Sequence, residues 1–495
     1  MKYLLGYDIG SSSIKVALIE AATGKALGSA FSPSMEMKIA SPQPGFAEQD
    51  PDNWWKELQN ATEKLRRQFS FKPDEILAIG ISYQMHGLVC IDKDLRPLRD
   101  AIIWCDSRAV EIGNKAFKEI GEEYCLKHLL NSPGNFTASK LKWVQQNQPD
   151  LYRKIYKVLL PGDYIALKLT GEPTTTVTGL SEAILWNYDS WGVAKELLNY
   201  YKIEENLLPG LVPIFGEQGR LANAPAKLLQ LIPGIPVSYR AGDQPNNAYS
   251  LHVLQPGEIA ATAGTSGVVY GVTDKAEYDP LSRVNTFVHV NDKIDSHRFG
   301  ILLCINGTGI LNSWLRKNFF CDLSYGAINE AAASVNIGSE GLCFYPFGNG
   351  AERILSNKDT GACLQGLQFN RHRPEHVARA AQEGIVFALK YGIEIMQKMG
   401  MPVTAVRAGY ANMFLSAVFG GTFANATNCS LELYNTDGAV GAARAAGVGA
   451  KVYDNFEESF RGMELVRRIE PQKQAMQQTA DAYGKWKGNL STFIQ

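Results

Sequence analysis

Short apolar runs separated by turn residues open the chain. Residues 4–9, 14–20 and 26–31 are mostly apolar, and in the second run apolar residues recur at every second position. This alternation is typical of a β-strand. The intervening residues 10–13 and 22–25 contain Gly, Ser and Thr, which favour turns. The pattern therefore predicts a β-meander at the start of the chain.

A helical spacing follows Asp50. Asp is a favourable N-cap, and Pro51 suits the first position of a helix. One side of the predicted helix is apolar and consists of Trp54, Trp55, Leu58, Ala61 and Leu65. Further strands are predicted over residues 76–82 and 102–104, and residues 159–169 lead from a strand into a short helix. The first half of the chain therefore mixes strands and helices.

The opening hairpin pattern returns in the second half. Residues 257–263 and 268–272 read as strands, with Gly264–Gly267 as the turn between them. This turn lines up with Gly10–Ser13 at an offset of 264 − 10 = 254 residues, about half of the 495 residues. A repeat of this kind predicts two duplicated α/β domains, with a boundary near residues 245–257.

Composition narrows the class of partner. Apolar residues make up 45% of the chain, and 49 basic residues balance 50 acidic ones, for a net charge of -1. This balance gives no reason to expect nucleic acid or a membrane as a partner, so we expect a small molecule. The eight cysteines are scattered, without a zinc-like spacing, and no signal peptide is evident. We therefore expect a cytoplasmic protein.

The first turn has the composition of a phosphate-binding site. Gly10, Ser11 and Ser12 would expose backbone N–H groups and hydroxyl donors to phosphate oxygens. Asp8 cannot bind phosphate directly because both are anions, but it could do so through Mg²⁺. Lys15 could add positive charge. These residues are the candidates for binding a magnesium–nucleotide complex, with Asp8 as the metal ligand.

The second turn offers the same donors through Gly264, Thr265 and Ser266, but Thr262 stands where the first hairpin carries Asp8. Only the first hairpin therefore offers a carboxylate to a metal ion. Either turn alone could be purely structural, because Gly and Ser are ordinary turn residues. Two matched turns half a chain apart favour a function.

Several segments, in this order, resemble the motifs of the FGGY carbohydrate kinases, and most closely those that phosphorylate D-xylulose. They are Asp8–Ser13, Ala47–Trp55, Gln84–Gly87, Trp104–Arg108, Phe136–Leu141, Leu159–Tyr164, Gly242–Gln244 and Gly264–Gly267. The resemblance implies two actin-like (ribonuclease H-like) α/β domains, with ATP and the sugar in a cleft between them. We expect residues 1–245 to hold the sugar site and residues 246–495 the adenosine site.

The resemblance also implies roles for individual residues. Asp243 would be the catalytic base; without the family, Gly242–Pro245 would read as a turn. The expected sugar-binding residues are Met85, His86, Asp106 and Gln244, and the expected adenosine-site residues are Gly409 and Asn412. Asp106 could instead form a salt bridge with Arg108, and we expect Trp104 to belong to the core.

The predicted reaction is the transfer of phosphate from ATP, with Mg²⁺, to D-xylulose. One alternative is a kinase for another small sugar or polyol, such as ribulose, gluconate or glycerol. Another is an actin- or chaperone-like ATPase that phosphorylates no sugar. The sequence leaves the oligomeric state open, with a homodimer as one alternative.

Overall fold

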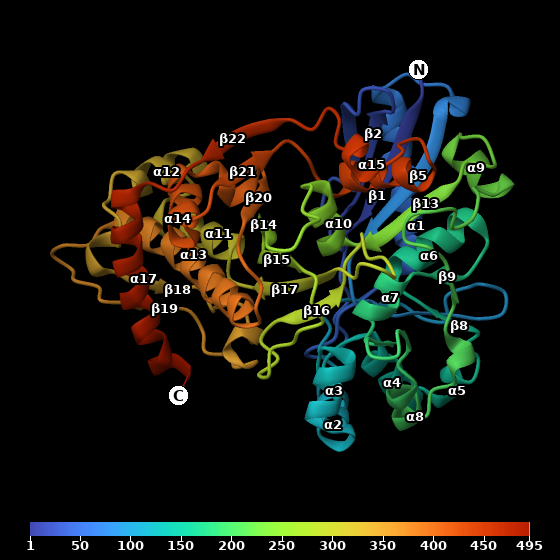
Figure 1. Cartoon of the computed structure of the whole chain (residues 1–495), viewed down its shortest axis with the longest axis horizontal. Helices are drawn as coiled ribbons and strands as arrows, with labels where there is room; N and C mark the ends of the chain where they lie inside the picture. The colour runs from blue at the N-terminus through green and yellow to red at the C-terminus, as the bar shows by residue number, and fades with distance from the viewer. Residues whose placement is uncertain (495) are drawn as a thin grey trace. The chain divides into compact units, whose positions relative to one another are not determined.

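The computed structural model describes residues 1–494, and it describes side chains through residue 490 (Figure 1). The chain forms two compact units. The first contains residues 1–252, 287–294 and 436–463, and the second contains residues 253–286 and 295–435 and the chain from Glu464 onward. The expected division assigns one continuous segment to each domain, residues 1–245 and residues 246–495. Each unit of the structure instead consists of three separate segments.

The first unit is built on a five-stranded sheet in the order β13-β5-β1-β2-β3. Strands β1, β5 and β13 are parallel, and β2 is antiparallel to both of its neighbours. The strands are β1 (Tyr3–Ile9), β2 (Ile14–Glu20), β3 (Ala26–Ser32), β5 (Ile76–Tyr83) and β13 (Val237–Gly242). The predicted β-meander and the strand predicted over residues 76–82 are confirmed.

Helix α1 (Pro51–Gln68) packs on β2 and β3. Asp50 caps this helix, since its side chain accepts a hydrogen bond from the Asp52 N–H at 2.9 Å, and the predicted apolar side is buried. Helix α15 (Gly438–Gly449) packs on β1, β5 and β13. A Cβ on Gly6 or Gly80 would collide with the backbone of α15, so these glycines permit a very close contact between helix and sheet.

The remaining helices of the first unit lie beside or below this sheet in Figure 1. They are α2 (Val110–Ile120), α3 (Glu122–Leu129), α4 (Thr137–Asn147), α5 (Pro149–Tyr152), α6 (Pro161–Thr170), α7 (Val177–Glu182), α8 (Lys195–Tyr201), α9 (Asn223–Leu229), α10 (Asp243–Ser250) and α16 (Phe456–Ser459). Helix α6 ends at Thr170, and Gly171 is its C-cap, close to the predicted helix end.

The second unit repeats the strand order of the first. Its sheet contains β17-β15-β14-β20-β21, extended by β22. The strands are β14 (Glu258–Ala263), β15 (Gly267–Thr273), β17 (Phe299–Ile305), β20 (Ala405–Gly409), β21 (Leu431–Tyr434) and β22 (Leu465–Ile469). The sequence of parallel and antiparallel pairs also matches, because β14, β20 and β21 are parallel and β15 is antiparallel to both neighbours. The predicted duplication of the hairpin is confirmed.

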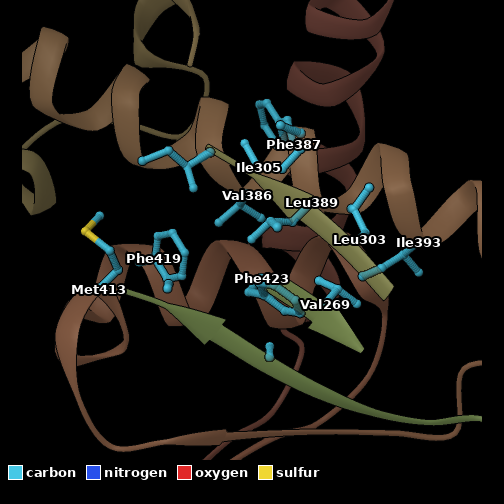
Figure 2. Close-up of a cluster of buried hydrophobic side chains, with 14 of the residues drawn as sticks. Val269, Leu303, Ile305, Val386, Phe387, Leu389, Ile393, Met413, Phe419 and Phe423 are labelled. Carbon is cyan, nitrogen blue, oxygen red and sulfur yellow. The ribbon is translucent and has the colours of Figure 1, made fainter. Parts of the chain in front are cut away.

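The core of the second unit lies between this sheet and its helices. Side chains from β15, β17, α13 (Pro374–Lys398) and α14 (Ala417–Thr427) meet there, including Val269, Leu303, Val386, Phe419 and Phe423 (Figure 2). The other helices are α11 (Gly309–Phe319), α12 (Tyr325–Ala333) and α17 (Lys473–Ile494). Among the 494 described residues, no helix is long and apolar enough to cross a membrane.

Candidate functional site

Polar side chains gather where the three parallel strands of the first unit end. Asp8 lies opposite Ser82 near the end of β1, and Gly242 lies opposite Tyr83 at the end of β13. The carboxyl ends of parallel strands meet at one edge of a sheet, which is a common position for ligands. A pocket of about 360 Å³ lies at this edge, lined by Asp8, Gly10, Ser11, Ser12, Ser13, Lys15, Gln84, Trp104 and Asp243.

The turn between β1 and β2 is held from several sides. The Gly10 N–H donates to the Ser13 carbonyl at 3.1 Å and closes the turn. The Ser11 carbonyl accepts from Gln49 Nε2 at 2.7 Å, and the Ser12 carbonyl accepts from the Met37 N–H at 2.8 Å. Because these carbonyls are tied to neighbouring segments, the orientation of the turn is fixed, as a phosphate-binding turn requires.

Asp8 presents a carboxylate to the pocket. Ser82 Oγ donates to its Oδ1 at 2.8 Å, and Gly438 packs so closely against the carboxylate that a Cβ would not fit. Burial raises the pKa of Asp8, and Asp437 raises it further, whereas Ser82 and Lys15 act in the opposite direction. No three His, Cys, Asp or Glu side chains of the described residues are grouped to hold a metal ion. A single carboxylate fits Mg²⁺, which usually keeps several waters and binds phosphate as well.

Lys15 forms an ion pair that sequence reasoning missed. Its Nζ lies 3.1 Å from Asp437 Oδ2, and Asp437 also caps α15 by accepting from the Val440 N–H at 3.0 Å. Burial lowers the pKa of Lys15, but the attraction of Asp437 and Asp8 outweighs burial and raises it overall. The signal available in the sequence was an Asp directly before a helix of small residues, a typical N-cap.

Asp243 is the first residue of α10, directly after β13, and not part of a simple turn. Burial raises its pKa to about 7, with a further contribution from the negative charge of Asp8, while hydrogen bonds from Gln244 act against the rise. A carboxylate with this pKa can both accept and release a proton near neutral pH. These properties suit a general base.

Glu182 is a second buried acid close to Asp243, and no sequence pattern pointed to it. Its side chain is 1% exposed and lies against Gly242, and it interacts with the Tyr83 hydroxyl. Burial, followed by the nearby charge of Asp243, raises its pKa well above the ordinary value. Burial and the charge of Asp243 therefore both favour the protonated form of Glu182.

His86 has an unusual backbone conformation, and its ring is held by neighbouring groups. Its φ is 61°, its Nδ1 donates to the Glu182 carbonyl at 2.9 Å, and its ring packs against Phe136 and Phe287 at 4.8 and 5.4 Å between centroids. Since a carbonyl can only accept, Nδ1 carries a proton, and in the neutral form of the ring Nε2 would then be an acceptor. Such an acceptor suits a sugar hydroxyl. Met85, 5% exposed, lies beside Gly242.

Lys140 fixes the backbone at His86 through hydrogen bonds. Its side chain is fully buried, and Nζ donates to the carbonyls of His86 and Ile103, each at 2.9 Å. Burial lowers the pKa of Lys140 to about 8, although Asp106 partly opposes this effect. The sequence placed Lys140 in a family motif but indicated no role for it.

Asp106 is fully buried and forms the salt bridge that was the alternative to a sugar contact. Its carboxylate accepts from Arg108 at 2.7 Å and from the Ala47 N–H at 2.6 Å. A contact between Asp106 and the sugar stays a prediction.

The expectation that Trp104 is a core residue is wrong, because β7 (Ala101–Ile102) ends two residues earlier and leaves Trp104 43% exposed. Trp104 Nε1 donates to Ser11 Oγ at 3.4 Å.

The second hairpin borders a separate pocket within the second unit. The Gly264 carbonyl accepts from the Gly309 N–H at 2.8 Å, which joins the turn to the start of α11. The pocket has a volume of about 610 Å³, in the range of small-molecule sites. Of the predicted residues, Gly264, Thr265 and Asn412 line it, whereas Ser266 and Gly409 are outside its lining. Sequence reasoning missed its other polar lining residues, Asn312, Ser313, Tyr325 and Asn329.

Comparisons with known proteins agree with this architecture. The models for the N-terminal and C-terminal domains of the FGGY family of carbohydrate kinases match residues 3–249 and 259–450. The xylulose kinase of Escherichia coli (strain K12) is 27% identical over 493 residues, covering 99% of this chain and 97% of the relative. The crystal structure of a xyloylose kinase from Brucella ovis has a TM-score of 0.88 and 26% identity, and 99% of each chain is covered.

A more distant structure shows the same fold. The gluconate kinase from Lactobacillus acidophilus has a TM-score of 0.90 at 21% identity, covering 100% of this chain and 98% of that one. Together with the repeated strand order, these likenesses confirm the expected pair of actin-like α/β domains.

Proposed function

We propose, because the chain belongs to the FGGY family of carbohydrate kinases, that it transfers the γ-phosphoryl group of ATP to D-xylulose and forms D-xylulose 5-phosphate. The observation that carries this proposal is the pocket of the first unit, in which Asp8 and Asp243 lie on either side of β5. Phosphoryl transfer needs positioning, neutralisation of charge and a group that receives the proton of the attacking hydroxyl. The pocket offers a candidate for each need.

Asp243 is the proposed general base. Its carboxylate accepts the proton of the sugar hydroxyl while the hydroxyl oxygen bonds to the γ-phosphorus and the bond to ADP breaks. The pKa of about 7 supports this role, because the group is largely ionised slightly above neutral pH and is still basic enough to take the proton. The same surroundings favour the protonated form of the neighbouring Glu182, so Asp243 is the better candidate to accept the proton of the sugar.

Asp8 is the proposed ligand for Mg²⁺, and the Ser82 hydroxyl orients its carboxylate. When bound, the ion would offset the negative charge of the phosphates and of the group being transferred. Ser11 and Ser12 are proposed to donate to phosphate oxygens from the fixed turn. Lys15 would add positive charge, part of which is balanced by Asp437.

The sugar is proposed to bind near His86 and Asp243. The Nε2 atom of His86 would accept a hydrogen bond from one hydroxyl, while Met85 would offer an apolar surface to the C–H face of the sugar. Gln244 is a further candidate for a contact with a hydroxyl. A contact with Asp106 would need one of its present donors to be displaced.

The adenosine part of ATP is proposed to occupy the pocket of the second unit. Its volume of about 610 Å³ and its polar lining suit a nucleoside. Gly264, Thr265 and Ser266 would donate to phosphate oxygens, with Gly409 and Asn412 near the adenosine.

A panel of acceptors tests the proposal. Purified protein, ATP and Mg²⁺ are incubated with D-xylulose, ribulose, gluconate or glycerol, and ADP release is measured. We expect the highest kcat/KM with D-xylulose. A higher value with another acceptor would replace the proposed substrate while keeping the kinase. ADP release that no acceptor increases would instead support the actin- or chaperone-like ATPase.

A further inference from the structure

We propose that Gln84 contacts the phosphoryl group during its transfer, with its amide Nε2 donating to a phosphoryl oxygen. This inference rests on the proposed function and adds a residue that it leaves unused. Gln84 directly follows β5, the strand between β1, which carries Asp8, and β13, which Asp243 directly follows. All three residues line the same pocket.

The side-chain amide of Gln84 has no hydrogen-bond partner among the described residues. The side chain is 3% exposed, and within the part of the chain that the structure describes neither Nε2 nor Oε1 makes a hydrogen bond. The backbone of Gln84 is fixed, because its N–H donates to the Ile9 carbonyl at 2.9 Å. Buried polar groups are usually paired, and an unpaired one lowers stability. An unpaired amide on a residue that lines a pocket therefore indicates a ligand that pairs with it.

The surroundings of the amide determine which ligand suits it. The carboxylate of Asp8 is proposed to lie at the metal and phosphate side, and that of Asp243 at the side of the sugar hydroxyl. The phosphorus atom must travel between the leaving oxygen of ADP and this hydroxyl. A neutral donor between two carboxylates can bind the transferred oxygens without adding to the negative charge there. The phosphoryl group is thus the ligand that matches Nε2.

The substitution Gln84→Met tests this inference, because Met has nearly the same length and volume but no polar atoms. We expect kcat with D-xylulose to fall about 10- to 100-fold, while the KM values for both substrates change less than about twofold. Without substrates, the melting temperature should rise by about 2–4 °C, because an unpaired buried amide has been removed. A residue with only a structural role would not gain stability and lose turnover together.

Gln218 offers a matched control in the same unit. It is also a buried glutamine, at 1% exposed, and its Oε1 lacks a hydrogen-bond partner among the described residues, as that of Gln84 does. Its Nε2, however, donates to the carbonyls of Pro213 and Ile214 at 2.7 and 3.0 Å. Gln218→Met should therefore lower the melting temperature and leave kcat within about twofold of the wild type. The opposite signs of the two thermal shifts separate an unpaired amide Nε2 from a paired one.

Gln84→Glu keeps the shape of the side chain and replaces the donor with an acid. A third carboxylate beside Asp8 and Asp243 should reduce kcat more than Met does, and should move the acidic limb of the kcat profile to higher pH. The inference is overturned if Gln84→Met retains wild-type kcat or lowers the melting temperature. If the wild type itself phosphorylates no sugar, the proposed function fails instead, and the two failures are thus distinguished.

Discussion

Asp243→Asn is the substitution that most directly tests the proposed chemistry. Asn keeps the size of the side chain and can begin α10 as Asp does, but it cannot accept the proton of a hydroxyl. We expect kcat to fall by about 10²- to 10⁴-fold, with little change in the binding of either substrate. In the wild type, kcat should be low when Asp243 is protonated, and should rise toward a plateau as the pH passes about 7. The variant should show no such rise.

The same substitution should change stability in a way that depends on pH. The pKa of Asp243 is raised from 3.8 to about 7 in the folded protein, so the unfolded chain releases this proton more easily. The resulting penalty on folding begins above pH 3.8, grows as pH rises, and is complete above about pH 7. It amounts to about 4 kcal/mol at pH 8 and about 1.5 kcal/mol at pH 5. Asn removes the penalty at both values.

Two measurements on purified wild type and variant are therefore paired. Kinetics with saturating ATP and sugar are followed from pH 5 to pH 9, and chemical unfolding is compared at pH 5 and pH 8. We expect the variant to be nearly inactive and to gain about 2–3 kcal/mol more stability at pH 8 than at pH 5. An active variant would show that Asp243 only shapes the start of α10. An equal gain at both pH values would show that burial does not hold its pKa near 7.

Three further substitutions test other parts of the structure. Asp8→Ala should lower turnover while sugar binding without nucleotide, measured by calorimetry, stays nearly unchanged; an equal loss of sugar binding would indicate a folding defect. His86→Ala should reduce kcat/KM for the sugar by about tenfold to a hundredfold, since a lost contact with a hydroxyl is worth about 1–3 kcal/mol, and an unchanged value would remove His86 from the sugar site. Gly80→Ala should lower the free energy of unfolding by about 3 kcal/mol or more, because the added Cβ would collide with the Ala442 carbonyl; stability within about 0.5 kcal/mol of wild type would refute that close packing.

Local patterns were enough to predict the scaffold. The hairpins were found because strand alternation and small turn residues are properties of neighbouring residues, and the offset between Gly10 and Gly264 revealed the duplication. Helix α1 was found for the same reason, since Asp50 and Pro51 mark its start locally. The order of the strands in each sheet was beyond such reasoning, because it depends on contacts between distant segments.

The residues that sequence reasoning missed share a different property. Glu182 and Lys140 are buried titratable groups, and Asp437 pairs with Lys15 from a distant part of the chain. A charged residue in a sequence is usually exposed, so nothing local distinguishes Glu182 or Lys140, and the local signal at Asp437 indicated only a helix cap. Trp104 is the converse case, because a large aromatic residue is usually buried, but the early end of β7 leaves it at the pocket.

The late position of α15 in the sequence has a consequence for folding during synthesis. This helix covers β1 and β5, but it comes from residues 438–449, which leave the ribosome long after both strands. Until those residues have been synthesised, the glycine-lined face of both strands is uncovered and Lys15 lacks Asp437. The apolar surface of the nascent segment that contains β1 and β5 therefore stays exposed until α15 has been synthesised. A fragment that stops at residue 252 should accordingly bind hydrophobic dyes and require chaperones, whereas the full chain buries that face.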